Sequence, residues 1–126
     1  MPRSVFVSFV FEDRVHFQSV QRWANEKRLG NDVVVTCETM DVRPQGEAAI
    51  CAHLQPKIRG AACVLLLLGQ NTHSHEWVGY ELSVAASLGK KIIVTRIPGA
   101  TGTAPPAFAH LLPVGFEPAA LARALA

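Results

Sequence analysis

The chain has 126 residues, of which 49% are hydrophobic and 17% charged, and its formal net charge is +2. This length suits one domain with its own core, the composition excludes a disordered chain, and the small, dispersed charge gives no indication of a nucleic-acid groove. No apolar run approaches the ~20 residues that cross a bilayer, the first residues lack a signal-peptide pattern, and three widely spaced cysteines do not suit a disulfide framework, so we expect a single cytoplasmic domain over residues 1–126.

The first part of the chain predicts a strand and a helix. A compact apolar segment at residues 5–10 predicts the strand, and charged residues end it. A helical pattern follows at residues 14–29, and Gly30 is expected to stop this helix. The apolar residues expected on its core side are Val15, Phe17, Val20, Trp23 and Ala24.

Two further strands and a helix are predicted next. The β-branched segment at residues 32–36 predicts a strand, and a polar loop rich in proline and glycine comes after it. Residues 47–59 predict a helix, in which Pro56 is expected to cause a kink or an early end. The unbroken apolar run at 62–68 predicts a strand that is buried on both faces, as in a parallel sheet.

The last part of the chain continues the alternation. It predicts a helix at residues 76–88, a strand at 91–97, a loop at 98–110, a short edge strand at 111–116 and a terminal helix at 117–126. Strands that alternate with helices at this spacing are typical of an α/β fold. We therefore expect a flavodoxin-like parallel five-stranded sheet, in the order 2-1-3-4-5, with helices on both faces.

The phosphate-binding motifs common on such sheets are missing. No GxGxxG follows the first strand, and no GxxxxGK[ST] occurs anywhere. Glu12 and Asp13 come a few residues too late for the acidic site of a response-regulator receiver. A standard dinucleotide dehydrogenase, a nucleoside triphosphatase and a receiver domain are therefore disfavoured.

The helix after the central strand carries an acid and an aromatic on one face. Trp77 and Glu81 are four residues apart, so their side chains point the same way. In an open α/β sheet, ligands bind in the crevice beyond the carboxyl ends of the strands, and this helix begins there. Glu81 is therefore a candidate for a site at this edge of the sheet.

Three short motifs, in order, resemble a known family. They are Phe6-Val7-Ser8-Phe9, Gly69-Gln70-Asn71-Thr72-His73 and Trp77-Val78-Gly79-Tyr80-Glu81. Over residues 5–98 the chain resembles a TIR domain, and more closely the short bacterial TIR-like proteins of Thoeris-type antiphage systems. One departure is Val10-Phe11, where that family typically has Asp-Tyr.

The resemblance implies chemistry on NAD. TIR enzymes break the bond between nicotinamide and ribose, and many convert the ADP-ribose into a signalling nucleotide. Glu81 matches the catalytic glutamate of the family, and a carboxylate suits the task because it stabilises an oxocarbenium-like ribose. The expected product is a cyclic or histidine-linked ADP-ribose derivative that activates a separate effector protein. NAD as substrate is the only small molecule implied, and self-association is expected because TIR sites are often completed by a neighbouring protomer.

The other candidate site residues lie around the same edge. Ser8 and Phe9 end the first strand, Phe11 and Trp77 offer flat rings, Asp13 and Asp41 offer carboxylates for ribose, and His73 offers a proton relay. The predicted binding residues are thus Ser8, Phe9, Phe11, Asp13, Asp41, His73 and Trp77.

Several alternatives remain open. Glu81 also suits a solvated helix N-terminus, Trp77 suits core packing, and Phe11 suits a cap on the core. His73, His75, Cys51 and His53 lack the spacing of a zinc site, so no metal is expected. The alternative functions are a non-catalytic TIR-like interaction module and a nucleoside deoxyribosyltransferase. No nucleic acid or membrane partner is expected.

Overall fold

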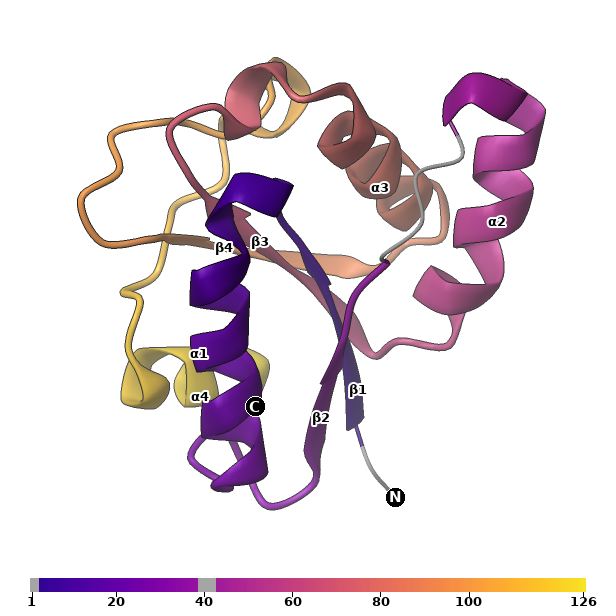
Figure 1. The fold of residues 1–126 in the computed structure, drawn as a ribbon. Helices are drawn as coiled ribbons and strands as arrows, with labels where there is room; N and C mark the ends of the chain where they lie inside the picture. Colours follow the sequence, from indigo (N-terminus) through magenta and orange to yellow (C-terminus); the bar gives the residue numbers. More distant parts are fainter. Residues whose placement is uncertain (1–2, 39–42) are drawn as a thin grey trace.

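Four parallel strands form the sheet in the computed structural model, which describes residues 3–38 and 43–126. The strands are β1 (Arg3–Ser8), β2 (Val33–Thr36), β3 (Cys63–Leu68) and β4 (Lys91–Arg96). Their order is β2-β1-β3-β4, and each neighbouring pair is parallel (Figure 1). Every residue of β3 is buried, because helices cover both faces of this central strand.

Two helices cover each face of the sheet. The helices are α1 (Arg14–Asn25), α2 (Glu47–Arg59), α3 (Glu76–Ser87) and α4 (Pro118–Leu125). Short 3-10 turns complete the described elements, at η1 (Phe11–Asp13), η2 (Arg43–Gln45), η3 (Thr72–Ser74) and η4 (Pro106–Phe108). Figure 1 shows α2 and α3 on one side of the sheet and α1 and α4 on the other. The predicted flavodoxin-like α/β fold is therefore confirmed.

The prediction of a fifth strand over residues 111–116 was wrong in extent. Residues 111–116 provide one parallel bridge, between Val114 and Thr95, beside β4. The Val114 amide donates to the Val94 carbonyl at 2.7 Å, and the Thr95 hydroxyl donates to the Val114 carbonyl at 2.9 Å. Because the Val114 amide faces β4, the residues that would continue a ladder are 112 and 116, and neither forms a bridge. The segment lies where a fifth strand was expected, but within the described residues the sheet has four strands.

Some predicted boundaries and core residues also need correction. β1 ends at Ser8, and α1 ends at Asn25, four residues before the predicted end. Val15, expected in the core, is 60% exposed; it lies five residues before Val20 and so about 140° away around the helix axis. The predicted core residues that are confirmed are Phe17, Val20, Trp23 and Ala24. α2 continues through Pro56 to Arg59, so the expected early end was wrong.

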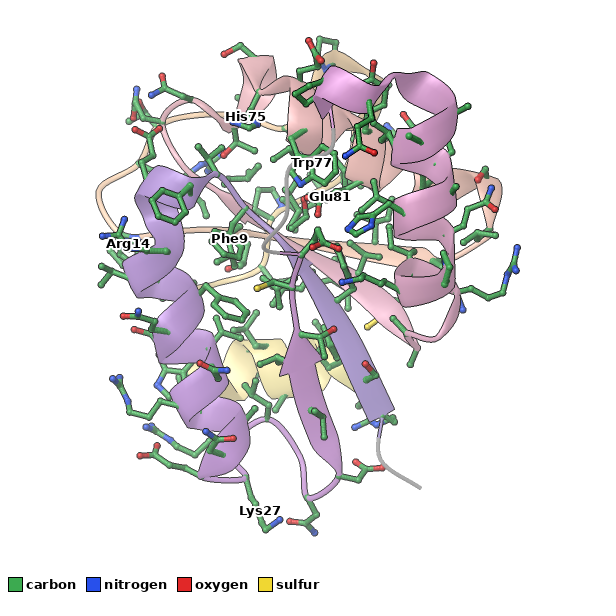
Figure 2. All side chains as sticks on the ribbon, turned by 45° about the vertical axis from the view of Figure 1, so that its right-hand side comes forward. Phe9, Arg14, Lys27, His75, Trp77 and Glu81 are labelled. Atoms are coloured by element: carbon green, nitrogen blue, oxygen red, sulfur yellow. The ribbon has the colours of Figure 1, made fainter. Side chains whose placement is uncertain are left out.

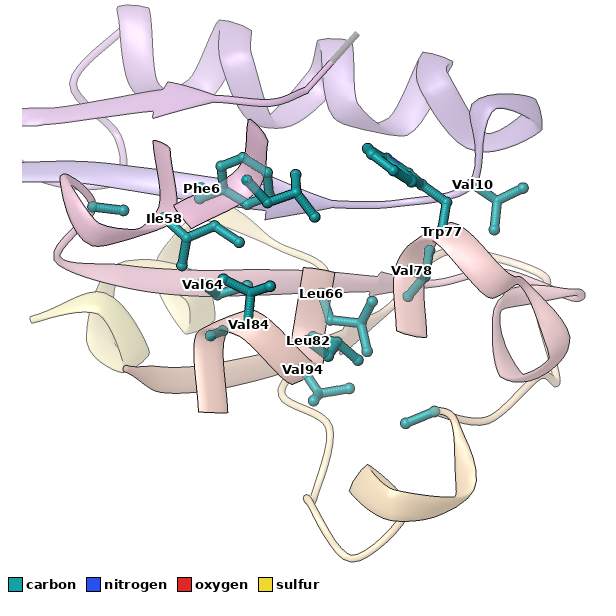
Figure 3. Close-up of a cluster of buried hydrophobic side chains, with 14 of the residues drawn as sticks. Phe6, Val10, Ile58, Val64, Leu66, Trp77, Val78, Leu82, Val84 and Val94 are labelled. Carbon is teal, nitrogen blue, oxygen red and sulfur yellow. The ribbon is translucent and has the colours of Figure 1, made fainter. Parts of the chain in front are cut away.

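Alternating strand residues supply the core on either face. Figure 3 shows the cluster between the sheet and helices α2 and α3, where Phe6, Val64 and Leu66 of the strands meet Val78 and Leu82 of α3. The intervening strand residues pack instead against α1 and α4. On a separate point, none of the helices within the described ranges is both long and apolar enough to cross a membrane. The cluster beneath α2 and α3 fixes α3 against the sheet, and α3 carries the residues considered next.

Candidate functional site

The fold brings Ser8 and Glu81 into contact. Ser8 is the last residue of β1, and Glu81 lies on α3. The Ser8 hydroxyl donates a hydrogen bond to Oε1 of Glu81 at 2.8 Å, although the two residues are 73 positions apart. Ser8 is fully buried and Glu81 is 2% exposed, so this bond lies in the interior, near the carboxyl edge of the sheet (Figure 2).

The environment of Glu81 favours its neutral form. Burial raises its pKa from 4.5 to about 8, the Ser8 hydrogen bond opposes this shift, and the negative charge of Glu38 adds to it. The protonated acid is therefore the main form of the free protein at pH 7. A surface glutamate near a helix N-terminus would be ionised and solvated, so the simple surface interpretation of Glu81 does not hold.

A second buried carboxyl group lies nearby, at the end of β2. The Glu38 side chain is 1% exposed, and its Oε2 lies 2.6 Å from Nε2 of His53 and 2.7 Å from Nζ of Lys57. Both partners belong to α2, four residues apart, so they share a helix face. Sequence reasoning missed this cluster. Its signal was an acid two residues after a predicted strand and a His–Lys pair at helical spacing.

The pKa of the Cys37 thiol is affected by both carboxyl groups. Its pKa is raised, first by burial and then by the negative charges of Glu81 and Glu38, while Lys57 lowers it. The thiol therefore lies in the field of the same groups, at the end of β2. The site thus combines the ends of β1 and β2 with side chains from α2 and α3.

Trp77 is largely a core residue. It lies one turn before Glu81 on α3, is 7% exposed, and packs in the hydrophobic cluster beneath α2 and α3 (Figures 2 and 3). Burial of this size agrees with the packing interpretation. Trp77 and Glu81 are thus two buried residues one turn apart on α3.

The two phenylalanines after β1 have other contacts. Phe9 stacks on Phe17 of α1, with ring centroids 4.9 Å apart and an interplanar angle of 10°. Because side chains alternate along a strand, Ser8 and Phe9 point to opposite faces of the sheet. Phe11 is 73% exposed, and the Arg14 guanidinium lies 4.6 Å from its ring centroid. It does not cap the core.

Asp13 places a further carboxyl group at the carboxyl edge of the sheet. It is 9% exposed, and a Cβ atom built on Gly69 would lie only 1.9 Å from its Oδ2. The carboxyl group therefore packs directly on the bare backbone of Gly69, just after β3. Its Oδ2 has no hydrogen-bond partner within residues 3–38 and 43–126. Burial, followed by the charge of Glu12, raises the pKa of Asp13, whereas His16 lowers it.

The loops beside Asp13 are held together by specific contacts. The Gly69 amide donates to the Thr72 hydroxyl at 2.8 Å, which shapes the turn into η3. The Gln70 side chain accepts from the Thr101 amide at 3.1 Å, which ties the loop after β4 to the loop after β3. His75 precedes α3, and its Nδ1 is buried without a hydrogen-bond partner in the described segments.

Two predicted binding residues are not placed by these contacts. Asp41 lies outside the described residues. His73 belongs to η3, after the central strand as predicted, but its side chain is not among those described.

Comparisons with known proteins identify the fold and the family. The sequence model described as "Thoeris protein ThsB, TIR-like domain" matches residues 6–102. No curated protein matches the chain. Among solved structures, the TIR domain of the Toll-related receptor TRR-2 from Hydra magnipapillata is similar, with 13% identity, a TM-score of 0.62, and coverage of 88% of this chain and 82% of that one. A 2-desoxiribosyltransferase from Leishmania mexicana also matches, with 22% identity over 75% of this chain and 65% of that one, but its TM-score of 0.48 supports no argument.

Proposed function

We propose that this chain, which belongs to the TIR-like domain family of the Thoeris protein ThsB, is an enzyme that breaks the nicotinamide–ribose bond of NAD. Its product is an ADP-ribose-derived signalling nucleotide, cyclic or histidine-linked, that activates a separate antiphage effector. The observation that carries the proposal is the buried Glu81 carboxyl group, held by Ser8 near the carboxyl edge of the sheet. Ligands of open α/β sheets bind at this edge.

Glu81 has the chemistry that the reaction needs. Nicotinamide leaves NAD as a neutral molecule without being protonated, so no general acid is required. Its departure gives a ribose ring with oxocarbenium character, and a carboxylate beside that ring stabilises the positive charge. Because Glu81 is 2% exposed, water screens this interaction little.

The raised pKa of Glu81 links its ionisation to substrate binding. In the free protein the acid is mostly neutral at pH 7, because its pKa is about 8. The nicotinamide ring of NAD is a cation, and a nearby positive charge favours the ionised carboxylate. NAD binding therefore lowers the pKa of Glu81 and produces the charged form where the ribosyl cation develops.

The neighbouring residues take supporting roles. Ser8 donates a hydrogen bond to Oε1 of Glu81 and so orients the carboxyl group. Oδ2 of Asp13 has no partner in the described parts of the chain and offers an acceptor for a hydroxyl group. Trp77 is buried one turn before Glu81 on α3. Roles for Asp41 and His73 at the rim remain part of this proposal.

The burial of Glu81 favours an enzyme over a purely structural module. A buried, desolvated acid destabilises the folded state, and an assembly module gains nothing from it. Functional sites are where strongly shifted pKa values gather. Self-association and an effector reached through a diffusible product complete the proposal for this cytoplasmic domain.

The test is nicotinamide release from NAD by the purified protein, beside a Glu81→Gln variant. The matched control is Glu76→Gln, which changes an exposed glutamate on the same helix. We expect release by the wild type and the control and none by Glu81→Gln, with product masses that separate plain hydrolysis from signal synthesis. Equal release by Glu81→Gln would remove Glu81 as the catalytic acid.

Two further conditions in the same assay separate the NAD-cleaving enzyme from the two alternative functions, a deoxyribosyltransferase and a non-catalytic module. Free nucleosides offered in place of NAD test for a deoxyribosyltransferase, because that enzyme class exchanges their bases. Lysate from phage-infected cells supplies an activating trigger. A wild-type protein that releases no nicotinamide even in that lysate is a non-catalytic module.

A further inference from the structure

The residues that follow β1 place an aromatic ring and a cation together at the surface. Phe11 belongs to η1 and is 73% exposed. The Arg14 guanidinium lies 4.6 Å from the centroid of the Phe11 ring, which is a cation–π contact. One guanidinium covers one face of a ring, so at this exposure the other face of Phe11 is open to solvent.

Arg14 carries its charge without an acidic partner. The carboxyl groups of Glu12 and Asp13 directly precede it in the chain, yet across residues 3–38 and 43–126 no carboxylate forms an ion pair with Arg14. The guanidinium has five N–H donors in a planar fork. A fork of donors and an open aromatic face therefore lie side by side, and neither is engaged with an acid or with the core.

Two contacts fix this segment to the loop that leads into α3. The Asn71 side-chain amide donates to Oε1 of Glu12 at 2.8 Å. The Asp13 carboxyl group lies directly on the backbone of Gly69, and both Gly69 and Asn71 lie between β3 and α3. The segment after β1 therefore has a defined position at the carboxyl edge of the sheet.

The chain itself limits the distance from the Phe11 ring to the buried acid. Phe11 follows Ser8 by three residues, so their Cα atoms are at most about 11 Å apart. Ser8 in turn donates its hydrogen bond to Glu81 at 2.8 Å. Figure 1 shows that α1 begins at the end of the sheet where β1 ends. This arrangement suits a dinucleotide, in which two riboses and a diphosphate hold the two bases apart.

We propose that Phe11 and Arg14 bind the adenosine diphosphate half of NAD. The adenine stacks on the open face of the Phe11 ring, and the diphosphate oxygens accept hydrogen bonds from the Arg14 guanidinium. This inference rests on the proposed cleavage of NAD at Glu81, because it assigns the other end of the same substrate. Arg14 and Phe11 are then substrate-positioning residues that do not take part in bond cleavage.

The chemistry of these groups fits that half of the molecule. Every base has a face that stacks on an aromatic ring, and a guanidinium matches phosphate oxygens in a planar, bidentate way. Arg14 is the first residue of α1, and the positive end of a helix dipole favours a phosphate there. Oδ2 of Asp13, which lies between the two residues in the chain, is buried without a partner in the described segments, so a ribose hydroxyl can supply the missing donor.

Binding of ADP and of adenosine, measured by isothermal titration calorimetry, tests this assignment without any cleavage. Phe11→Ala should weaken the binding of both ligands by roughly tenfold or more, because both contain the base. Arg14→Gln should weaken ADP by roughly tenfold or more and change adenosine by no more than about twofold, because adenosine has no phosphate. The matched control is Val15→Ala, which removes another exposed apolar side chain, 60% exposed, and should change neither affinity.

The kinetic test compares NAD with nicotinamide mononucleotide, which has the same bond to nicotinamide but no adenosine half. Phe11→Ala should raise KM for NAD by roughly tenfold or more with kcat within about twofold, and should leave kcat/KM for the mononucleotide unchanged. Equal losses with the two substrates would show a role at the reacting centre or in folding, and would overturn the assignment.

The outcomes separate this proposal from the one on which it rests. ADP and adenosine affinities in Phe11→Ala and Arg14→Gln that equal those of the wild type would overturn the assignment, even if the wild type releases nicotinamide. A wild type that binds ADP through Phe11 and Arg14 but releases no nicotinamide, even in infected-cell lysate, would support the adenosine diphosphate site and refute the proposed function.

Discussion

Replacing Glu81 by glutamine should make the protein more stable, and increasingly so as the pH rises. The carboxyl group has a pKa of about 8 in the folded protein and near 4.5 in the unfolded chain. The folded state therefore binds this proton more tightly. Between these two values, raising the pH favours the unfolded state, and the full destabilisation is present above pH 8. Glutamine has no proton to lose and can still accept the Ser8 hydrogen bond.

The pKa shift of Glu81 sets the size of this stabilisation by Glu81→Gln. At 1.36 kcal/mol per pH unit, a change from 4.5 to about 8 corresponds to about 5 kcal/mol of destabilisation above pH 8. At pH 5.5, one unit above the unfolded value, the same group destabilises the fold by only about 1 kcal/mol. The advantage of Glu81→Gln should therefore grow by about 3–4 kcal/mol between pH 5.5 and pH 9. Any constant effect of burying the amide cancels in this comparison.

Urea denaturation followed by circular dichroism at pH 5.5, 7 and 9 measures the effect. The free energy of unfolding is compared between the wild type and Glu81→Gln at each pH. Glu76→Gln is the control, and its difference from the wild type should vary far less because Glu76 is exposed. A gap between Glu81→Gln and the wild type that is the same at pH 5.5 and pH 9, or that shrinks, would refute the reasoning about Glu81.

Three further predictions concern activity and packing near the site. The kcat/KM for NAD should rise with pH and level off above about pH 8, since the free enzyme must ionise Glu81; a flat profile from pH 6 to 9 would contradict this. Ser8→Ala should lower kcat/KM at pH 7 by roughly tenfold or more, because it removes a hydrogen bond that favours the ionised carboxylate, and the loss should shrink at pH 9; an equal loss at both values would point to a different role for the hydroxyl. Gly69→Ala should destabilise the fold by about 1–3 kcal/mol in urea denaturation, because the added Cβ meets the Asp13 carboxyl group, and Asp13→Ala should restore most of that loss in the double variant. Additive effects of the two substitutions would show that no such collision exists.

The fold could be predicted because the signals are local. The unbroken apolar run of β3 and the strand–helix alternation are sufficient for a parallel sheet with helices on both faces. The extent of the fifth strand was overestimated because hydrophobicity does not show how many residues of an edge segment pair with the sheet, and here only Val114 does. Val15 was misassigned because its hydrophobicity was weighed without its angular position on α1.

The site was only partly predictable. Ser8 and Glu81 were both named, but their direct hydrogen bond depends on how α3 packs against β1. Phe9 and Phe11 were chosen for their rings, but Phe9, directly after β1, stacks on Phe17 of α1, on the sheet face opposite Ser8. Glu38 and its partners on α2 were missed because their meeting depends on the packing of α2 beside the end of β2. Sequence spacing shows which residues share a helix face, but not which face meets which strand end.

The central claim is that Glu81 carries the cleavage of NAD. Its most direct test is a time course of nicotinamide release at pH 8.5 by equal amounts of folded wild type and Glu81→Gln, both supplied with lysate from phage-infected cells. The account predicts steady release by the wild type, together with an ADP-ribose-derived product, and none above the lysate background for Glu81→Gln. The same release by both proteins, or none by either, would contradict it.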